Sequence, residues 1–189
     1  MKNSELIGKG LEKVNYLTSF EGYDDYTNDS KVDFEYLPLG ALHFRLFDGK
    51  TYCVADYNTT KLGTSGVGIK VLSSDQTDLT QADVSEEINR KWKDYLGQTI
   101  RSIRFYIKKE AWTNYNQNEE YPESMKIEFD NGRSIFYFCG DVDAYSVSKG
   151  RYKLIGGRDA GVVFFDRLTF EKYDLHKTDK IESEYGLQH

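Results

Sequence analysis

Proline, cysteine and histidine are scarce in this chain of 189 residues, and each scarcity excludes a class of structure. Two prolines are too few for a long proline-rich linker, so we expect residues 1–189 to form a single domain. Two cysteines, Cys53 and Cys139, define neither a disulfide framework nor a metal-binding spacing. Both fall in expected strands, where a buried and reduced thiol is the usual state.

Long apolar runs are also missing. No stretch approaches the roughly 20 residues that cross a membrane as a helix, and residues 1–5 contain no apolar signal segment. We therefore expect a cytoplasmic protein that does not bind membranes.

The net charge is −6, from 25 basic and 31 acidic side chains. Proteins that bind nucleic acids without sequence preference neutralise phosphates with lysine and arginine, so we expect no nucleic-acid binding. An acidic surface is compatible with a basic protein partner, and equally with an ordinary solvated surface.

Sequence signatures of catalysis and cofactor binding are absent. The three histidines, at positions 43, 176 and 189, do not have the spacing of a metal-ligand pair. Residues 63–66 do not match the frame of a nucleophile elbow, and no P-loop or dinucleotide fingerprint occurs. Asp141 and Asp143 end an expected strand, but a solvated turn explains them better than a cation site. We therefore expect no catalytic residue, no cofactor and no metal.

Aromatic residues, by contrast, reach 15%, which favours strands. Asn131-Gly132 lies between alternating apolar runs, the strongest short-range signal for a hairpin. A two-residue turn there pairs Ile127 with Phe136 and Met125 with Phe138, on a face that we expect to be buried.

Asp48-Gly49 predicts a second hairpin, in which Phe44 pairs with Cys53 and Leu42 with Ala55. Its opposite face, with His43, Arg45, Tyr52 and Asp56, is expected to be partly wet. The two hairpins have similar sequences. An ancient duplication would explain the likeness, and so would the shared chemistry of hairpin turns.

Two segments have helical patterns. Residues 84–96 follow a capping box at Asp83 and Glu86, carry an apolar stripe and end at Gly97. Residues 4–20 carry a less regular stripe. We therefore predict an α+β fold, a mostly antiparallel sheet built on hairpins with helix 84–96 packed on one face. The segments 1–35 and 176–189 are expected to be peripheral or mobile, and the strand order stays open.

Acidic and aromatic residues mix in the polar segment 20–26 and in and around the polar insertion 113–121. Tyrosine and tryptophan are favoured at protein interfaces, and acidic side chains steer basic partners. Ordinary loop composition in a tyrosine-rich chain is the alternative explanation. The residues that we predict to contact a partner are Tyr23, Asp24, Asp25, Tyr26, Trp112, Tyr115, Glu119 and Glu120.

Three stretches between residues 85 and 175 carry a resemblance to a known group of proteins. They are the helix-to-strand pattern of Trp92, Leu96, Gly97, Ile100 and Ile103, the run from Tyr121 to Gly132 with its continuation to Asp141, and the segment from Asp159 to Phe165. The chain resembles small bacterial α+β proteins of the immunity type, from polymorphic-toxin systems. The resemblance implies a cytoplasmic, non-catalytic protein that binds a basic toxin domain stoichiometrically. It implies no particular contact residue, because these families share no contact motif.

We therefore expect a non-enzymatic protein-binding module that blocks a toxin. Two alternatives stay open. The first is an enzyme or small-ligand-binding protein whose site has no linear motif, with a pocket lined by tyrosine and phenylalanine. The second is a structural or assembly subunit, which would oligomerise without a different partner.

Overall fold

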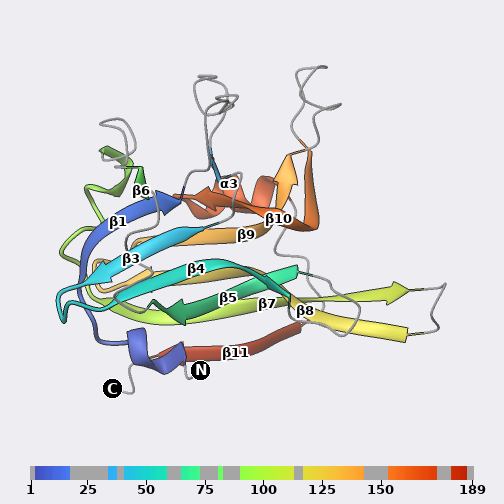
Figure 1. Cartoon of the computed structure of the whole chain (residues 1–189), viewed down its shortest axis with the longest axis horizontal. Coiled ribbons are helices and arrows are strands. Elements are labelled where there is room, and N and C mark those ends of the chain that lie inside the picture. The colour runs from blue at the N-terminus through green and yellow to red at the C-terminus, as the bar shows by residue number, and fades with distance from the viewer. Residues whose placement is uncertain are drawn as a thin grey trace.

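Two antiparallel sheets stack face to face in the computed structural model, which describes residues 3–17, 34–37, 41–58, 65–72, 81–82, 90–112, 117–142, 153–173 and 180–186 (Figure 1). The five-stranded sheet has the order β5-β4-β3-β1-β6. Its strands are β1 (Leu11–Leu17), β3 (Leu42–Leu46), β4 (Thr51–Asn58), β5 (Ser65–Val71) and β6 (Gln81–Ala82).

The six-stranded sheet has the order β11-β7-β8-β9-β10-β2. Its strands are β2 (Glu35–Leu37), β7 (Ile100–Trp112), β8 (Gln117–Phe129), β9 (Ser134–Val142), β10 (Leu154–Phe164) and β11 (Lys180–Gly186). A 3-10 helix, η1 (Asn3–Leu6), precedes β1, and a short helix, α3 (Arg167–Lys172), follows β10.

The main hydrophobic core lies between the two sheets. Both sheets contribute buried side chains to it, among them Val14, Phe44, Val54 and Ile69 from the first sheet and Ile103, Ile127, Ile135 and Val163 from the second. Trp92 and Tyr95 also pack into this core, and their polar atoms are satisfied there. The Trp92 indole N–H donates to the Tyr16 hydroxyl at 2.7 Å, and the Tyr95 hydroxyl donates to the Phe165 carbonyl at 2.8 Å.

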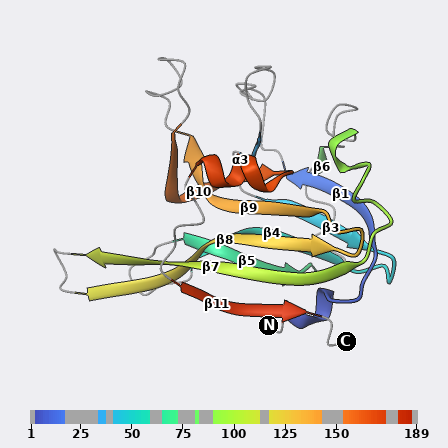
Figure 2. The same cartoon turned by 180° about the vertical axis from the view of Figure 1, so that it is seen from behind.

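A second hydrophobic cluster covers the outer face of the six-stranded sheet, where α3 lies over β9 and β10 (Figure 2). The Phe170 ring of α3 stacks on Phe136 with a centroid separation of 4.5 Å. Asp166 caps the helix by accepting a hydrogen bond from the Thr169 amide at 2.8 Å. Both faces of this sheet are therefore at least partly covered, which agrees with the aromatic side chains on both.

The prediction of a mostly antiparallel sheet is confirmed, but the fold is predominantly β, with short helices, rather than a clear α+β fold with one packed amphipathic helix. Of the predicted helix 84–96, the described part is helical only at residues 90–92 and continues as turns to Gly97. Residues 83–89 lie outside the described residues. Gly97 ends this segment with a φ of +81°, as predicted for a glycine after a helix.

The prediction of a helix over residues 4–20 is also wrong. Only η1 is helical there, and residues from Leu11 form β1. Val14 and Tyr16 alternate towards the core with the period of a strand, and Leu6 is completely buried. The segment 3–17 thus contributes to the core rather than being peripheral. Residues 18–33, 176–179 and 187–189 lie outside the described residues, and within the predicted tail residues 180–186 form β11 at the edge of the six-stranded sheet.

Both predicted hairpins form, but each loop has three residues rather than two. The amide of Gly49 donates to the Leu46 carbonyl at 2.9 Å, and that of Gly132 donates to the Phe129 carbonyl at 3.0 Å. Both glycines have φ near +80°, which the third position of a three-residue hairpin loop requires. The sequence signal, a glycine after Asp or Asn, fits both loop lengths.

The longer loops shift both registers by one residue from our prediction. Phe44 pairs with Tyr52 rather than Cys53, and Ile127 pairs with Ile135 rather than Phe136. The other predicted pairs are wrong for the same reason, since the observed ones are Leu42↔Val54 and Met125↔Tyr137. A shift of one residue moves side chains to the opposite face, so Tyr52 lies in the core and Cys53 does not.

The chain contains the same strand arrangement twice. In the first half β1, β3, β4 and β5 are consecutive neighbours, and β6 returns to pair with β1. In the second half β7, β8, β9 and β10 are consecutive neighbours, and β11 returns to pair with β7. β2 comes from the first half but crosses to the other sheet, where it pairs with β10.

The match extends to individual positions. The first strand of each half has a register shift at the equivalent place, between Leu11 and Lys13 in β1 and between Ile100 and Ser102 in β7. Hairpin chemistry alone would not reproduce this irregularity or the returning fifth strand. The likeness of the two hairpins therefore belongs to a structural repeat of the whole five-stranded unit.

Candidate functional site

The β7–β8 hairpin extends beyond the rest of its sheet as a two-stranded arm (Figure 1). On β7 the pairing with β11 reaches Ile107, and on β8 the pairing with β9 reaches Ser124. Beyond these residues the described part of the ladder joins β7 and β8 alone, as far as Trp112↔Gln117. We call residues 108–112 and 117–122 the arm. Both of its edges offer backbone donors and acceptors, as edge strands do.

The base of the arm is built around one buried carboxylate. A register shift beside Tyr106 and Ile107 leaves Glu123 as an extra residue in β8, and bulges of this kind bend a strand. Glu123 is 6% exposed, and its Oε1 lies 2.8 Å from Nζ of Lys108. Gly156 makes room for the carboxylate, because a Cβ at that position would clash with Oε1. The arm therefore leaves the sheet at a defined point.

Three of the eight residues predicted to contact a partner lie on the arm, namely Trp112 on β7 and Glu119 and Glu120 on β8. In the register Glu119 is opposite Glu110 and Glu120 is opposite Lys109. The expected polar insertion 113–121 is thus a strand from residue 117 onward. The other predicted contact residues, Tyr23, Asp24, Asp25, Tyr26 and Tyr115, lie outside the described residues.

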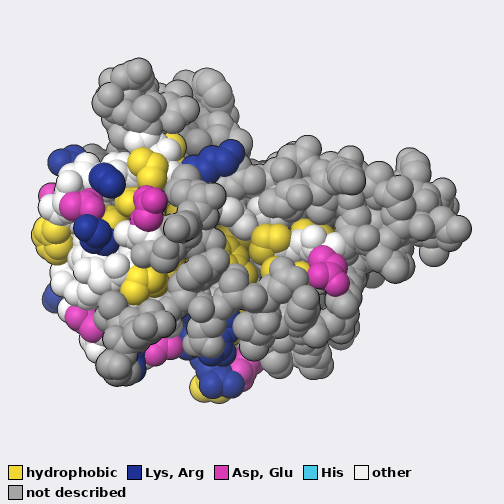
Figure 3. All heavy atoms as spheres, turned by 90° about the horizontal axis from the view of Figure 1, so that it is seen from below, with side chains coloured by type: hydrophobic (Ala, Val, Ile, Leu, Met, Phe, Trp, Pro, Cys, Tyr) yellow, Lys and Arg dark blue, Asp and Glu magenta, His cyan; other side chains and the backbone are white. Residues whose placement is uncertain are grey.

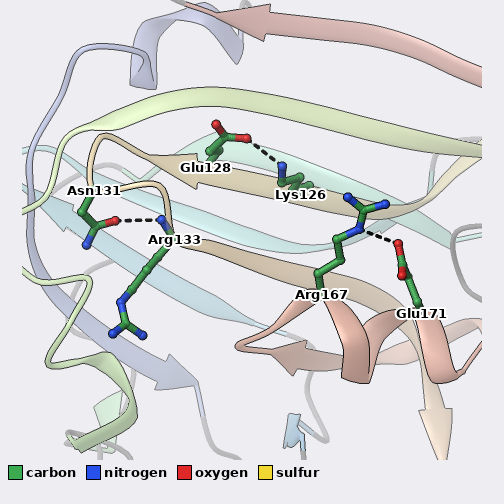
Figure 4. Close-up of polar contacts among 6 residues, drawn as sticks. All are labelled: Lys126, Glu128, Asn131, Arg133, Arg167 and Glu171. Carbon is green, nitrogen blue, oxygen red and sulfur yellow. Dashed lines mark hydrogen bonds and ion pairs between the residues drawn. The ribbon is translucent and has the colours of Figure 1, made fainter.

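Away from the arm, several charged side chains form ion pairs. Lys126 Nζ lies 2.6 Å from Glu128 Oε2 on β8, and Arg167 Nε lies 2.5 Å from Glu171 Oε1 on α3 (Figure 4). Figure 4 also shows the Arg133 amide donating to the Asn131 side chain in the hairpin loop, at 3.0 Å.

The face seen from below has the same character. Lysine and arginine side chains are interspersed with aspartate and glutamate over its coloured part (Figure 3). This mixture resembles an ordinary solvated surface.

The corrected register brings three chemically capable residues into one row across the five-stranded sheet. His43 is paired with Asn15 on β1 and with Cys53 on β4. The amide of Leu46 donates to the Lys50 carbonyl, so these two residues form a hydrogen-bonded pair. Hydrogen-bonded and non-hydrogen-bonded pairs alternate along an antiparallel ladder, which makes His43 and Cys53 a non-hydrogen-bonded pair, the kind in which facing side chains are closest. Cysteine, histidine and asparagine together are the set that some thiol enzymes use.

This row is buried, which limits what it can do. Asn15, His43 and Cys53 expose 9%, 4% and 7% of their surfaces, and Cys53 packs with Ala41 and Ala55. Burial lowers the pKa of His43 below its usual 6.5, so the imidazole is neutral at pH 7. Its Nδ1 is buried without a hydrogen-bond partner. A neutral imidazole can accept a thiol proton, but in this conformation solutes do not reach it.

Of the two carboxylates singled out at the end of β9, Asp141 is engaged in hydrogen bonds within the fold. Asp141 Oδ1 accepts hydrogen bonds from the Tyr36 hydroxyl at 2.5 Å and from the Val142 amide at 2.7 Å, which ties β9 to β2. Asp143 lies outside the described residues. Within the described ranges, no group of three or more histidine, cysteine, aspartate or glutamate side chains is arranged to hold a metal ion.

No family model, curated protein or solved structure matches the chain. None of the helices in the described segments is long and apolar enough to cross a membrane.

Proposed function

We propose that this protein is a non-enzymatic binding module of the immunity type, which neutralises a partner toxin by stoichiometric binding in the cytoplasm. The observation that carries the proposal is the two-stranded arm, which extends beyond the sheet and holds Trp112, Glu119 and Glu120.

An arm of this kind is suited to contact with another protein. Two-stranded ribbons are marginally stable alone in water, and they gain stability when a partner pairs with or packs on them. Trp112 is of the residue type that most often anchors an interface. The adjacent glutamates would attract a basic toxin domain and speed its encounter.

The ordered, partly buried base of the arm supports the same proposal. Tyr121 is buried there with 1% exposure, and the ion pair of Lys108 and Glu123 joins β7 to β8 at the point where the arm begins. A preformed binding element loses less conformational freedom when the partner binds. The arm would then lie across the active site of the toxin, or beside it, and occlude its substrate.

The proposal is tested by capture of the partner from a native cell lysate, using the full tagged chain and mass spectrometry. We expect one stoichiometric partner with a toxic domain, and we expect co-expression of the chain to restore growth. Glu119→Lys with Glu120→Lys should weaken the complex at least about tenfold and reduce its salt dependence, because the attraction to a basic partner is lost.

A matched control has the same change in net charge away from the arm, namely Glu5→Lys with Glu12→Lys on η1 and β1. This control should keep the affinity within a factor of about two, as rim charges do. Equal losses in the two variants would show that net charge, and not the arm, determines binding.

The row of Asn15, His43 and Cys53 favours a second candidate function, a thiol enzyme. It requires that Cys53 become accessible, so the rate of alkylation by iodoacetamide separates the two functions. We expect Cys53 to react no faster than Cys139, which is also buried. A fast reaction that is abolished in His43→Ala would favour the enzyme instead.

A further inference from the structure

The two sheets end differently, although the strands at their outer edges are equivalent. β5 and β10 are the fourth strands of the two halves. Val54 and Tyr137 follow the hairpin glycines of their halves at the same distance along the chain, so the pair Val54↔Ile69 is equivalent to the pair Tyr137↔Val163. The outer side of β10 is covered by β2. None of the described strands pairs with the outer side of β5.

Hydrogen-bond alternation gives the direction of the backbone groups on β5. The Leu72 amide donates to the Thr51 carbonyl on β4 at 2.9 Å, and in an antiparallel ladder consecutive residues face alternate neighbours. The residues that direct their N–H and C=O groups away from β4 are Val67, Ile69 and Val71. On β10 the residues equivalent to the first two are Gly161 and Val163, and both pair with β2.

β5 has few of the features that normally protect an edge strand. It is seven residues long, its ladder with β4 has no bulge, and it contains no proline. Lys70 is its one charged residue, and Val71 is 38% exposed. A regular edge strand presents a row of backbone donors and acceptors with which another strand can pair.

We propose that β5 pairs antiparallel with β5 of a second copy of this chain, with the two-fold axis beside Gly68. In this register Val67 of one copy is opposite Ile69 of the other, and because both side chains are already buried in the core of their own chain, the contact is made by backbone hydrogen bonds. Lys70 is opposite Gly66, so the two lysines do not face each other. The contact is isologous, and it does not depend on a toxin partner.

The first test measures the self-association of the full chain by sedimentation equilibrium over a range of concentrations. We expect a reversible dimer. Val71→Pro removes an amide that points to the open edge and keeps every hydrogen bond to β4, so it should raise the dissociation constant at least about tenfold. Val71→Ala shortens the same side chain but keeps the amide, and it should leave the constant within about threefold.

The second test uses disulfide cross-linking and does not depend on the proline variant folding. Both native cysteines are first replaced by alanine. Gly68→Cys then faces its own copy across the axis, where the backbones are closest, and should form a cross-linked dimer on mild oxidation. Lys70→Cys alone should not, but mixed with Gly66→Cys it should cross-link.

Several outcomes would overturn the proposal. They are a chain that stays monomeric at all concentrations, a dimer that Val71→Pro does not weaken, and equal cross-linking of Gly68→Cys and Lys70→Cys. A monomer whose β5 amides become protected from exchange only with a different protein would assign the edge to a heterologous strand instead.

Discussion

Gly8 and Gly97 occupy equivalent positions in the two halves, and each donates its amide to the first strand of the opposite half. The Gly8 amide bonds the Ile100 carbonyl at 2.9 Å, and the Gly97 amide bonds the Leu11 carbonyl at 2.8 Å. Their φ angles are +79° and +81°. The repeat is therefore joined by a reciprocal pair of hydrogen bonds at residues that need the left-handed conformation.

Gly97→Ala should destabilise the protein by about 1–2 kcal/mol, because a Cβ is unfavourable in this conformation. No atom lies within 4 Å of the position that the Cβ would take, so the effect is conformational rather than steric. Gly97→Asn should lose less, since asparagine tolerates positive φ. Urea denaturation measures both variants. If alanine and asparagine destabilise equally, backbone conformation is not the cause.

The sequence predicts the positions of both hairpins, because Asp48-Gly49 and Asn131-Gly132 are strong turn signals. It does not predict the loop length, since a glycine with positive φ suits a two-residue and a three-residue loop alike. That single residue decides which side chains face the core. The row of His43 and Cys53 was missed for this reason, because the predicted register put the two on opposite faces.

The arm was only partly predictable. The polar composition and the lack of alternation from Gln117 to Tyr121 indicate a loop, and the strand forms there through pairing with β7. Tertiary pairing outweighs local preference in such segments. Trp112 and Glu120 lie in separate polar segments of the sequence, and the pairing of β7 with β8 places both on the arm.

Tyr16→Phe should destabilise the protein by about 1–3 kcal/mol, because it leaves the buried indole N–H of Trp92 without its acceptor. Thermal and urea unfolding measure the change. A double-mutant cycle with Trp92→Phe isolates the pair from other effects of either residue. The combined variant should lose less than the sum of the single ones, and strict additivity would show that the hydrogen bond adds no stability.

His43 should make the stability of the protein fall as the pH drops below 6.5. Burial lowers its pKa in the folded state, so between the usual pKa of 6.5 and the lowered one the unfolded chain binds a proton that the folded chain does not. Stability is complete above this window and declines through it. Asn15 and Cys53, its neighbours on the same face, offer no carboxylate that would oppose the trend.

Urea unfolding between pH 5 and 8, roughly the range over which histidine changes charge, tests this expectation. His43→Gln should flatten the slope below pH 6.5. An unchanged slope in His43→Gln would mean that other groups cause the acid sensitivity.

Gly156→Ala should loosen the base of the arm, because the added methyl group and the Glu123 carboxylate would occupy the same space. If the carboxylate moves, Lys108 loses its partner at 2.8 Å, and the ladder beyond it loses its anchor. We expect a destabilisation of about 1–3 kcal/mol, typical of overpacking. Amide hydrogen exchange should become faster in residues 108–112 and 117–122 than in β3 and β4.

The combined variant Glu123→Ala with Gly156→Ala separates the clash from other effects of the methyl group. Removing the carboxylate makes space for the methyl group, so Gly156→Ala should destabilise the Glu123→Ala protein far less than the original chain. Equal losses in both backgrounds would place the strain elsewhere in β10. Faster exchange throughout the molecule would show that Glu123 supports the whole fold, and not the arm in particular.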